Sequence, residues 1–279
     1  RCNVRNRGVE MTLGYNDTFG KVNYSTHLTY TANQNKIVEM VHDYRNPIDN
    51  SLVNITELTL KEAGDVYLRE GYSMSDVFTT GILQRGRDGK LVEEGNGYQV
   101  DRSQRIRLGS ADPDFTMGWS NTLTYKNLEL YFLIDFRFGG EVMSLTQSEL
   151  DANGVTKVTE DARTRGYVEY QGQKFNDPRA FYSAVGGRNA ISEYYMYDAT
   201  CIRLREVSLS YSFPKTILEN SRFIKGIDVS LAARNLCFLK KEAPFDPDAV
   251  MSVGNNNQGV DVFGMPTTRN IGFNLRLTF

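Results

Sequence analysis

The chain lacks the long apolar runs of a helical membrane protein. No stretch of its 279 residues approaches the roughly 20 consecutive apolar residues that a spanning helix needs. It also lacks a charge imbalance, with 32 lysines and arginines against 34 aspartates and glutamates, so nucleic-acid binding is not expected. Its three cysteines, Cys2, Cys201 and Cys237, match neither a disulfide framework nor zinc-ligand spacing. The first ten residues are charged without an apolar core, so we expect any export signal to lie upstream.

Aromatic residues are plentiful, and their pattern predicts strands. Sixteen tyrosines and fifteen phenylalanines against seven prolines are typical of β structure. Between Lys21 and Ala32, polar residues occupy the odd positions and mostly apolar residues the even ones. Residues 9–16 alternate in the same way, and residues 17–20 join the two segments. Because a period of two is the strand period, we predict a hairpin here.

The rest of the chain repeats this pattern. A second hairpin is predicted from Phe115 to Phe138, with its turn at Lys126-Asn127. In residues 269–279, apolar side chains alternate with Asn, Gly, Arg and Thr. Two further strands are predicted at about 199–213 and 226–238. Short strand-like runs at 66–68 and 77–83 are expected to extend the same wall.

Strand length and loop length together favour a membrane barrel. The predicted strands exceed the usual five or six residues of a soluble sheet and fit the roughly 9–11 residues of a tilted spanning strand. Short or moderate connections at 17–20, 126–127 and 214–225 alternate with long ones at 34–113, 139–198 and 239–268. Outer-membrane barrels sort their connections in this way, with tight periplasmic turns and long external loops.

One strand changes phase. Ile202 and Leu204 have even numbers, whereas the apolar residues from Val207 onward have odd ones, so the parity flips at Arg205-Glu206. A β-bulge at this point would restore a single apolar face. Alternatively, Ile202 and Leu204 lie above the lipid, where facing is unconstrained.

Several segments carry a family resemblance. Residues 198–214 resemble the penultimate-hairpin pattern of the SusC/RagA family of TonB-dependent outer-membrane transporters. Other matching segments are Arg234-Asn235-Leu236, Phe245-Asp246-Pro247, the closing strand 269–279, and residues 3–10, 111–115 and 121–127. The similarity covers essentially the whole chain in the family's order and spacing.

This resemblance implies the fold class: an all-β, transmembrane antiparallel β-barrel of roughly 22 strands with long extracellular loops and a plug in its lumen. The sequence supplies about seven clear strands. The resemblance therefore implies that residues 1–279 are the C-terminal part of such a barrel, and that the plug domain and the TonB box are absent from this chain.

Charges on the polar strand faces are expected to line the lumen and contact the plug. In a soluble sandwich they would instead be an ordinary solvated face. The predicted lumen-facing residues are Glu10, Lys21, Glu129, Asp135, Arg137, Asp228, Arg234 and Arg276. Phe279 is predicted to be the terminal aromatic signal that the barrel-assembly machinery recognises.

Loop residues give the few hints of ligand chemistry. Tyr194, Tyr195 and Tyr197 are candidate contacts for sugar or peptide groups, with packing under a long loop as the favoured alternative. The pairs Asp112/Asp114 and Asp246/Asp248 flank prolines and could hold calcium, but such carboxylates more often form Asx turns. His27 and His42 have no partner at triad or metal spacing, so no catalytic, metal or cofactor site is predicted.

Together these features predict an outer-membrane nutrient importer that takes up oligosaccharides or peptides and is not an enzyme. The resemblance implies four protein and membrane partners: a SusD-like surface lipoprotein, TonB, the remaining N-terminal barrel with its plug, and the lipid bilayer. A stand-alone outer-membrane barrel, acting as adhesin or enzyme, and a soluble carbohydrate-binding β-sandwich are the alternatives.

Overall fold

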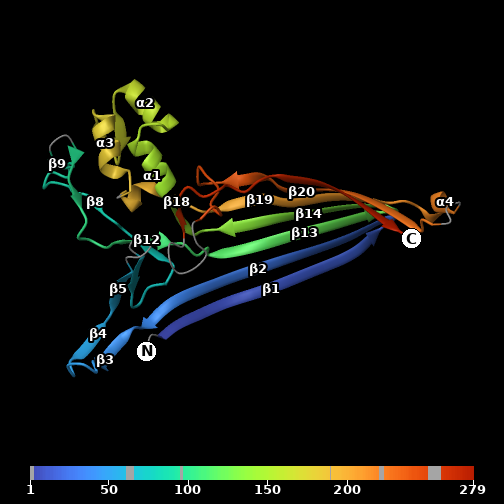
Figure 1. The fold of residues 1–279 in the computed structure, drawn as a ribbon, viewed down its shortest axis with the longest axis horizontal. Helices are drawn as coiled ribbons and strands as arrows, with labels where there is room; N and C mark the ends of the chain where they lie inside the picture. The colour runs from blue at the N-terminus through green and yellow to red at the C-terminus, as the bar shows by residue number, and fades with distance from the viewer. Residues whose placement is uncertain (1–2, 61–65, 95–96, 189, 220–222, 251–258) are drawn as a thin grey trace.

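A seven-stranded antiparallel sheet dominates the computed structural model (Figure 1). The structure describes residues 3–60, 66–94, 97–188, 190–219, 223–250 and 259–279. The seven strands neighbour one another in chain order, and every hydrogen-bonded pair within this sheet is antiparallel. They are β1 (Asn3–Phe19), β2 (Val22–Glu39), β13 (Phe115–Tyr125), β14 (Leu128–Phe138), β19 (Cys201–Ser212), β20 (Gly226–Lys241) and β22 (Asn270–Thr278).

All the connections predicted to be short lie at one end of this sheet, and the long ones lie at the other. The N-terminus lies at the long-loop end and the C-terminus at the short-turn end (Figure 1). Both predicted hairpins are confirmed, with registers that run from Phe19↔Val22 and from Tyr125↔Leu128. β1 and β22 are the two edges, and neither pairs on its outer side with any residue that the structure describes.

The register gives the sheet one polar and one apolar face. Leu13 pairs with Leu28, Leu28 with Trp119, and Trp119 with Ile134, so these side chains share a face. That face is not covered by a second layer: in β22 Ile271 is 74% exposed and Phe273 is 65% exposed. A soluble β-sandwich would bury such a face against another sheet. The apolar band is therefore the surface expected to meet lipid.

The phase change in β19 is a bulge. Leu133 of β14 pairs with Glu206, and the next residue, Ile134, pairs with Leu204, which leaves Arg205 as the extra residue. The pairing of β19 with β20 is irregular at the same place, because Leu204 pairs with Cys237 whereas Glu206 pairs with Arg234. Asn235 lies in this second irregularity with φ of 53°. The bulge interpretation of the sequence is confirmed, and Ile202 and Leu204 return to the apolar face.

Small sheets occupy the long-loop end. The runs at 66–68 and 77–83 pair in separate two-stranded sheets, so the expectation that they extend the wall was wrong. The strands outside the main sheet are β3 (Val41–Arg45), β4 (Leu52–Ile55), β5 (Glu57–Leu60), β6 (Val66–Arg69), β7 (Asp76–Phe78), β8 (Ile82–Leu83), β9 (Glu93–Glu94), β10 (Gly97–Tyr98), β11 (Val100–Asp101), β12 (Arg107–Ser110), β15 (Glu141–Ser144), β16 (Val168–Tyr170), β17 (Gln173–Phe175), β18 (Met196–Asp198) and β21 (Val260–Asp261).

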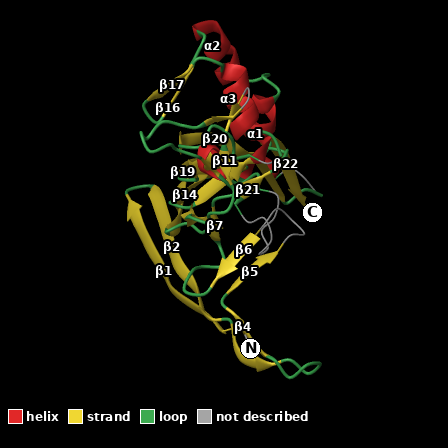
Figure 2. Cartoon of the chain, turned by 90° about the vertical axis from the view of Figure 1, so that its left-hand side faces the viewer, coloured by secondary structure: helices red, strands yellow, loops and turns green. Residues whose placement is uncertain are grey.

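The loop between β14 and β19 folds into a helical unit that the strand pattern did not predict. Seen from the loop end, its helices lie on the side opposite the β3–β4 hairpin (Figure 2). Its helices are α1 (Leu145–Ala152), α2 (Lys157–Arg165), α3 (Pro178–Val185) and the 3₁₀ turn η2 (Ser192–Tyr195); a fourth helix, α4 (Lys215–Leu218), lies in the connection between β19 and β20. In the described part of the chain, no helix has the length and apolar character to cross a membrane.

Helix caps and an aromatic core hold this unit together. Ser144, Thr156 and Asp177 accept hydrogen bonds from the first-turn amides of α1, α2 and α3. Phe181 is completely buried, and its ring lies 5.0 Å from that of Phe175. The unit therefore has its own hydrophobic core, separate from the sheet.

The alternation of β22 predicts opposite outcomes for two neighbouring substitutions in the full-length protein. Leu275→Arg places a charge on the apolar face and should destabilise the inserted protein by about 2–4 kcal/mol. Arg276→Leu changes the polar face and should leave membrane insertion nearly intact. Both are measured as heat-modifiable protein in the outer-membrane fraction. Equal insertion of the two variants would contradict the assignment of the faces.

Candidate functional site

The polar face of the sheet collects the charges that the sequence analysis singled out. Glu10 pairs with Thr31, Thr31 with Thr116, and Thr116 with Arg137, so these four side chains share a face. The same register places Glu129, Asp135, Asp228, Arg234 and Arg276 on that face. Lys21 instead lies in the turn between β1 and β2. The role of this face as a lumen wall stays a prediction.

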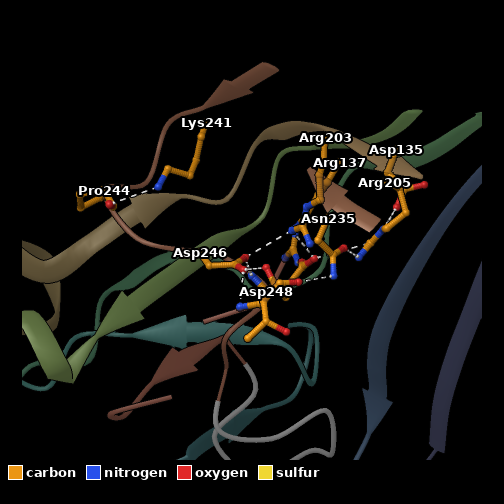
Figure 3. Close-up of polar contacts among 11 residues, drawn as sticks. Asp135, Arg137, Arg203, Arg205, Asn235, Lys241, Pro244, Asp246 and Asp248 are labelled. Carbon is orange, nitrogen blue, oxygen red and sulfur yellow. Dashed lines mark hydrogen bonds and ion pairs between the residues drawn. The ribbon is translucent and has the colours of Figure 1, made fainter. Parts of the chain in front are cut away.

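The bulge concentrates charge at the long-loop end of this face. Because Arg205 is an extra residue, Arg203, Arg205 and Glu206 all turn to the polar side instead of alternating. Arg205 forms an ion pair with Asp135 of β14, and its Nη1 lies 3.5 Å from Oδ1 of Asn235 (Figure 3). The two irregular strands are thereby joined by side chains at the place where their backbone pairing is interrupted.

Arg203 is the most enclosed charge of the cluster, with 2% of its side chain exposed. Its Nη2 lies 2.6 Å from Oδ2 of Asp248 and 3.3 Å from Oδ1 of Asp246. Its guanidinium carbon stands 4.5 Å from the ring centre of Phe238, a cation–π distance. A charge buried this deeply needs such partners, because an unpaired one would cost several kcal/mol.

Asp246 ties the cluster to the loop that leads into β22. One carboxylate oxygen accepts a hydrogen bond from the amide of Asp248 at 3.1 Å, and the other accepts from the amide of Thr267 at 3.2 Å and from its hydroxyl. Burial pushes the pKa of Asp246 up, but these hydrogen bonds and the charge of Arg203 outweigh it and hold the pKa below its usual value. Asp246 is therefore a charged Asx-turn residue.

A polar cavity of about 360 Å³ adjoins the cluster. Its lining includes Thr29, Thr31, Arg137, Arg203 and Asp248. Arg137 lies 3.7 Å from Asp248 and donates a hydrogen bond of 2.9 Å to the carbonyl of Ala111. Among the described residues, Nε of Arg137 and both Nε and Nη1 of Arg203 have no hydrogen-bond acceptor. The cavity can therefore bind polar groups.

The predicted ligand tyrosines lie in the helical unit, away from this cavity. Tyr195 is completely buried, which agrees with packing under the loop, and its role in ligand contact stays a prediction. The ring of Tyr194 lies 5.5 Å from that of Phe181, and the ring of Tyr197 lies 5.6 Å from that of Phe245. Tyr194 and Tyr197 are partly exposed, and their role in ligand contact stays a prediction.

Two further predicted features are the calcium candidate Asp112 and the terminal residue Phe279. Asp112 accepts a hydrogen bond of 2.5 Å from the hydroxyl of Ser75. No group of three or more potential metal ligands occurs within the residues the structure describes. Phe279 follows β22 and is exposed, and its role as assembly signal stays a prediction.

Sequence reasoning named Asp135 and Arg137 but missed the part played by Arg203, Arg205, Asp246 and Asp248. The parity flip was the available signal, because a bulge at Arg205 brings three charged residues, Arg203, Arg205 and Glu206, to one face. Nothing in the sequence spacing links Arg203 to carboxylates 43 and 45 residues away.

Comparison with known proteins shows sequence relatives over nearly the whole chain. TonB-dependent receptor P3 of Formosa agariphila is 25% identical over 297 residues, which covers 99% of this chain and 29% of the relative. TonB-dependent receptor P26 of the same organism is 26% identical over 296 residues, with the same coverage. The chain thus spans less than a third of the length of these relatives. No protein-family model matches it.

Solved structures share the fold. The RagAB peptide importer in its closed-closed state matches with a TM-score of 0.66 at 17% identity, covering 99% of this chain and 30% of that one. The open-open state matches with a TM-score of 0.64 at 16% identity, covering 100% of this chain and 29% of that one. The strand order and the uncovered apolar face of this chain agree with a segment of such a barrel wall.

The depressed pKa of Asp246 predicts a pH dependence. A carboxylate whose pKa is lower in the folded state contributes stability above its unfolded pKa and loses it as the pH falls through the folded pKa. We therefore expect the melting temperature of the full-length protein in detergent to fall as the pH drops below about 4. Asp246→Asn should melt lower at pH 7 and show a smaller fall.

The control for this prediction is Arg87→Gln, at an exposed loop position outside the cluster. This change removes no group that titrates between pH 3 and pH 7, so the variant should keep the wild-type dependence on pH. The role of Asp246 would be refuted if Asp246→Asn and wild type lost the same stability between pH 7 and pH 3.

Proposed function

We propose that this chain is the C-terminal part of the barrel of a SusC-like nutrient importer, on the basis of its similarity to two TonB-dependent receptors over 99% of its length. In this proposal, residues 1–279 form one section of a wall of roughly 22 strands, and the plug and the TonB box belong to the preceding part of the protein. The transported molecules are oligosaccharides or peptides, which cross without covalent chemistry.

One observation carries the proposal: the sheet is open at both edges, apolar on one face and polar on the other. An open sheet in lipid would leave the backbone groups of β1 and β22 unpaired, at several kcal/mol each. Further strands on both sides would satisfy these edges and close a barrel. The apolar face then meets lipid, and the polar face with its charge cluster lines the lumen.

The charge cluster suggests how the wall would contact a plug. Its ion pairs lie at the loop end of the polar face, and Arg205, Asp135 and Asp248 keep about a third of their side-chain surface exposed. Partly solvated polar contacts can be exchanged for water without leaving a buried charge unpaired. Such an interface would suit a plug that must be held at rest and released by TonB. A SusD-like lipoprotein would cover the long-loop end.

Of the alternatives, a soluble sandwich is disfavoured because the apolar face is uncovered. For example, 55% of the Leu275 surface is exposed. A stand-alone barrel that acts as adhesin or enzyme is disfavoured because the two relatives that match nearly the whole chain are both TonB-dependent receptors. The importer is therefore the function that the geometry and the relatives favour together.

The proposal predicts that uptake by the full-length protein needs TonB. Cells that express it should import labelled peptides or oligosaccharides, and deletion of TonB should abolish that import without changing the amount of inserted protein. Arg205→Glu, which places a negative charge beside Asp135, should insert normally and change uptake at least severalfold. Arg87→Glu, at an exposed loop position, is the matched control.

Uptake that persists without TonB would overturn the importer mechanism even if the barrel were correct. Wild-type uptake by Arg205→Glu would refute the proposed role of the cluster alone.

A further inference from the structure

An aromatic row marks the loop-side boundary of the apolar band. The ring of Tyr30 lies 5.4 Å from that of Phe115, and Phe115 stacks on Phe138 at 4.8 Å. The registers place these three residues on the apolar face. At the other end of β13 stands Tyr125, ten residues from Phe115, or roughly 25 Å for a tilted strand. This is the height of a hydrocarbon band between two aromatic girdles.

β1 and β2 continue beyond this row, and their outward positions turn cationic there. Val9 pairs with Ala32, Arg7 with Gln34, and Arg5 with Lys36, so Arg7, Arg5 and Lys36 point to the same side as the apolar band. They lie two and four residues past its edge, roughly 5–10 Å higher for a tilted strand. That is the depth of lipid headgroups.

These three cations are exposed and have no ion pair among the residues described here. They line a hollow of about 530 Å³ together with Arg107, Asp76, Asp112 and Asp114. Asp76 is already paired with Arg107 at 2.9 Å, and Asp112 accepts its hydrogen bond from Ser75. With four cations against three carboxylates, the hollow keeps a net positive charge, and its outward cations stand on the strands next to lipid.

We propose that Arg5, Arg7 and Lys36 form a binding site for the phosphate of an anionic lipid headgroup in the outer leaflet. The apolar band below them would hold the acyl chains, so one molecule could meet both surfaces at once. Guanidinium groups suit phosphate, because they donate paired hydrogen bonds as well as charge. The inference rests on the membrane orientation in the proposed function and adds a lipid ligand to it.

The test uses the full-length protein in detergent micelles, with native mass spectrometry to count bound lipid. Wild type should bind phosphatidylglycerol more tightly than phosphatidylcholine, and 1 M salt should weaken this preference. The triple variant Arg5→Gln/Arg7→Gln/Lys36→Gln should bind phosphatidylglycerol about a hundredfold more weakly, at about fivefold for each charge. The matched control Arg87→Gln/Lys90→Gln/Arg179→Gln removes three exposed cations from the segments that connect the long strands, one of them in α3, and should bind as wild type does.

Three results would overturn the site: wild-type affinity in the triple variant, an equal loss in the control, or equal binding of the two lipids by wild type. If the triple variant failed to insert, the single substitutions would decide, each with an expected fivefold loss. If the lipid site is refuted, the prediction of TonB-dependent uptake still stands. If the protein binds the lipid but imports without TonB, only the importer mechanism is refuted.

Discussion

Backbone pairing at the edges of the sheet is the constraint on which the rest of this structure depends. In hydrocarbon, unpaired amide and carbonyl groups have no water to bind, so a sheet must close on itself. This chain presents a continuous seven-stranded meander from β1 to β22 with both edges open. A sheet with one apolar and one polar face and unpaired edges is stable in a membrane only as part of a closed barrel wall. The polar face then needs a hydrated interior, and the apolar face needs lipid.

The charge cluster depends on the same geometry. Arg203 is enclosed by Asp246, Asp248 and Phe238, which lie on β20 and on the loop after it. These contacts join the start of β19 to a loop that is also hydrogen-bonded to Thr267, just before β22. A buried ion pair of this kind adds little net stability, because removing two charges from water is costly. Its effect is to fix how three elements meet at the rim of the sheet.

Strand pattern and loop sorting were enough to predict the seven strands and their two hairpins, because each depends on local alternation. They also located the phase change at Arg205-Glu206, but a bulge was only one of two interpretations until the register was known. The helical unit was missed although its N-cap residues, Ser144, Thr156 and Asp177 with Pro178, are readable as helix starts. Its helices are short, and their core forms from residues spread over the whole loop. The partners of Arg203 could not be predicted, since contacts across 43 and 45 residues depend on the tertiary fold.

The bulge also determines how this strand tolerates genetic change. Because side chains alternate with a period of two, one residue more or less exchanges the faces of everything beyond it. Arg205 is the exception in β19, because it is the residue left out of the pairing with β14. Deleting Arg205 would bring Leu204 next to Glu206 in regular alternation and keep Ile202 and Leu204 on the apolar face, at the cost of the ion pair with Asp135. Deleting a residue at any other position of β19 would exchange the faces on one side of the deletion. Related chains should therefore lose a residue within β19 only at this bulge, and other insertions and deletions should accumulate in the long loops.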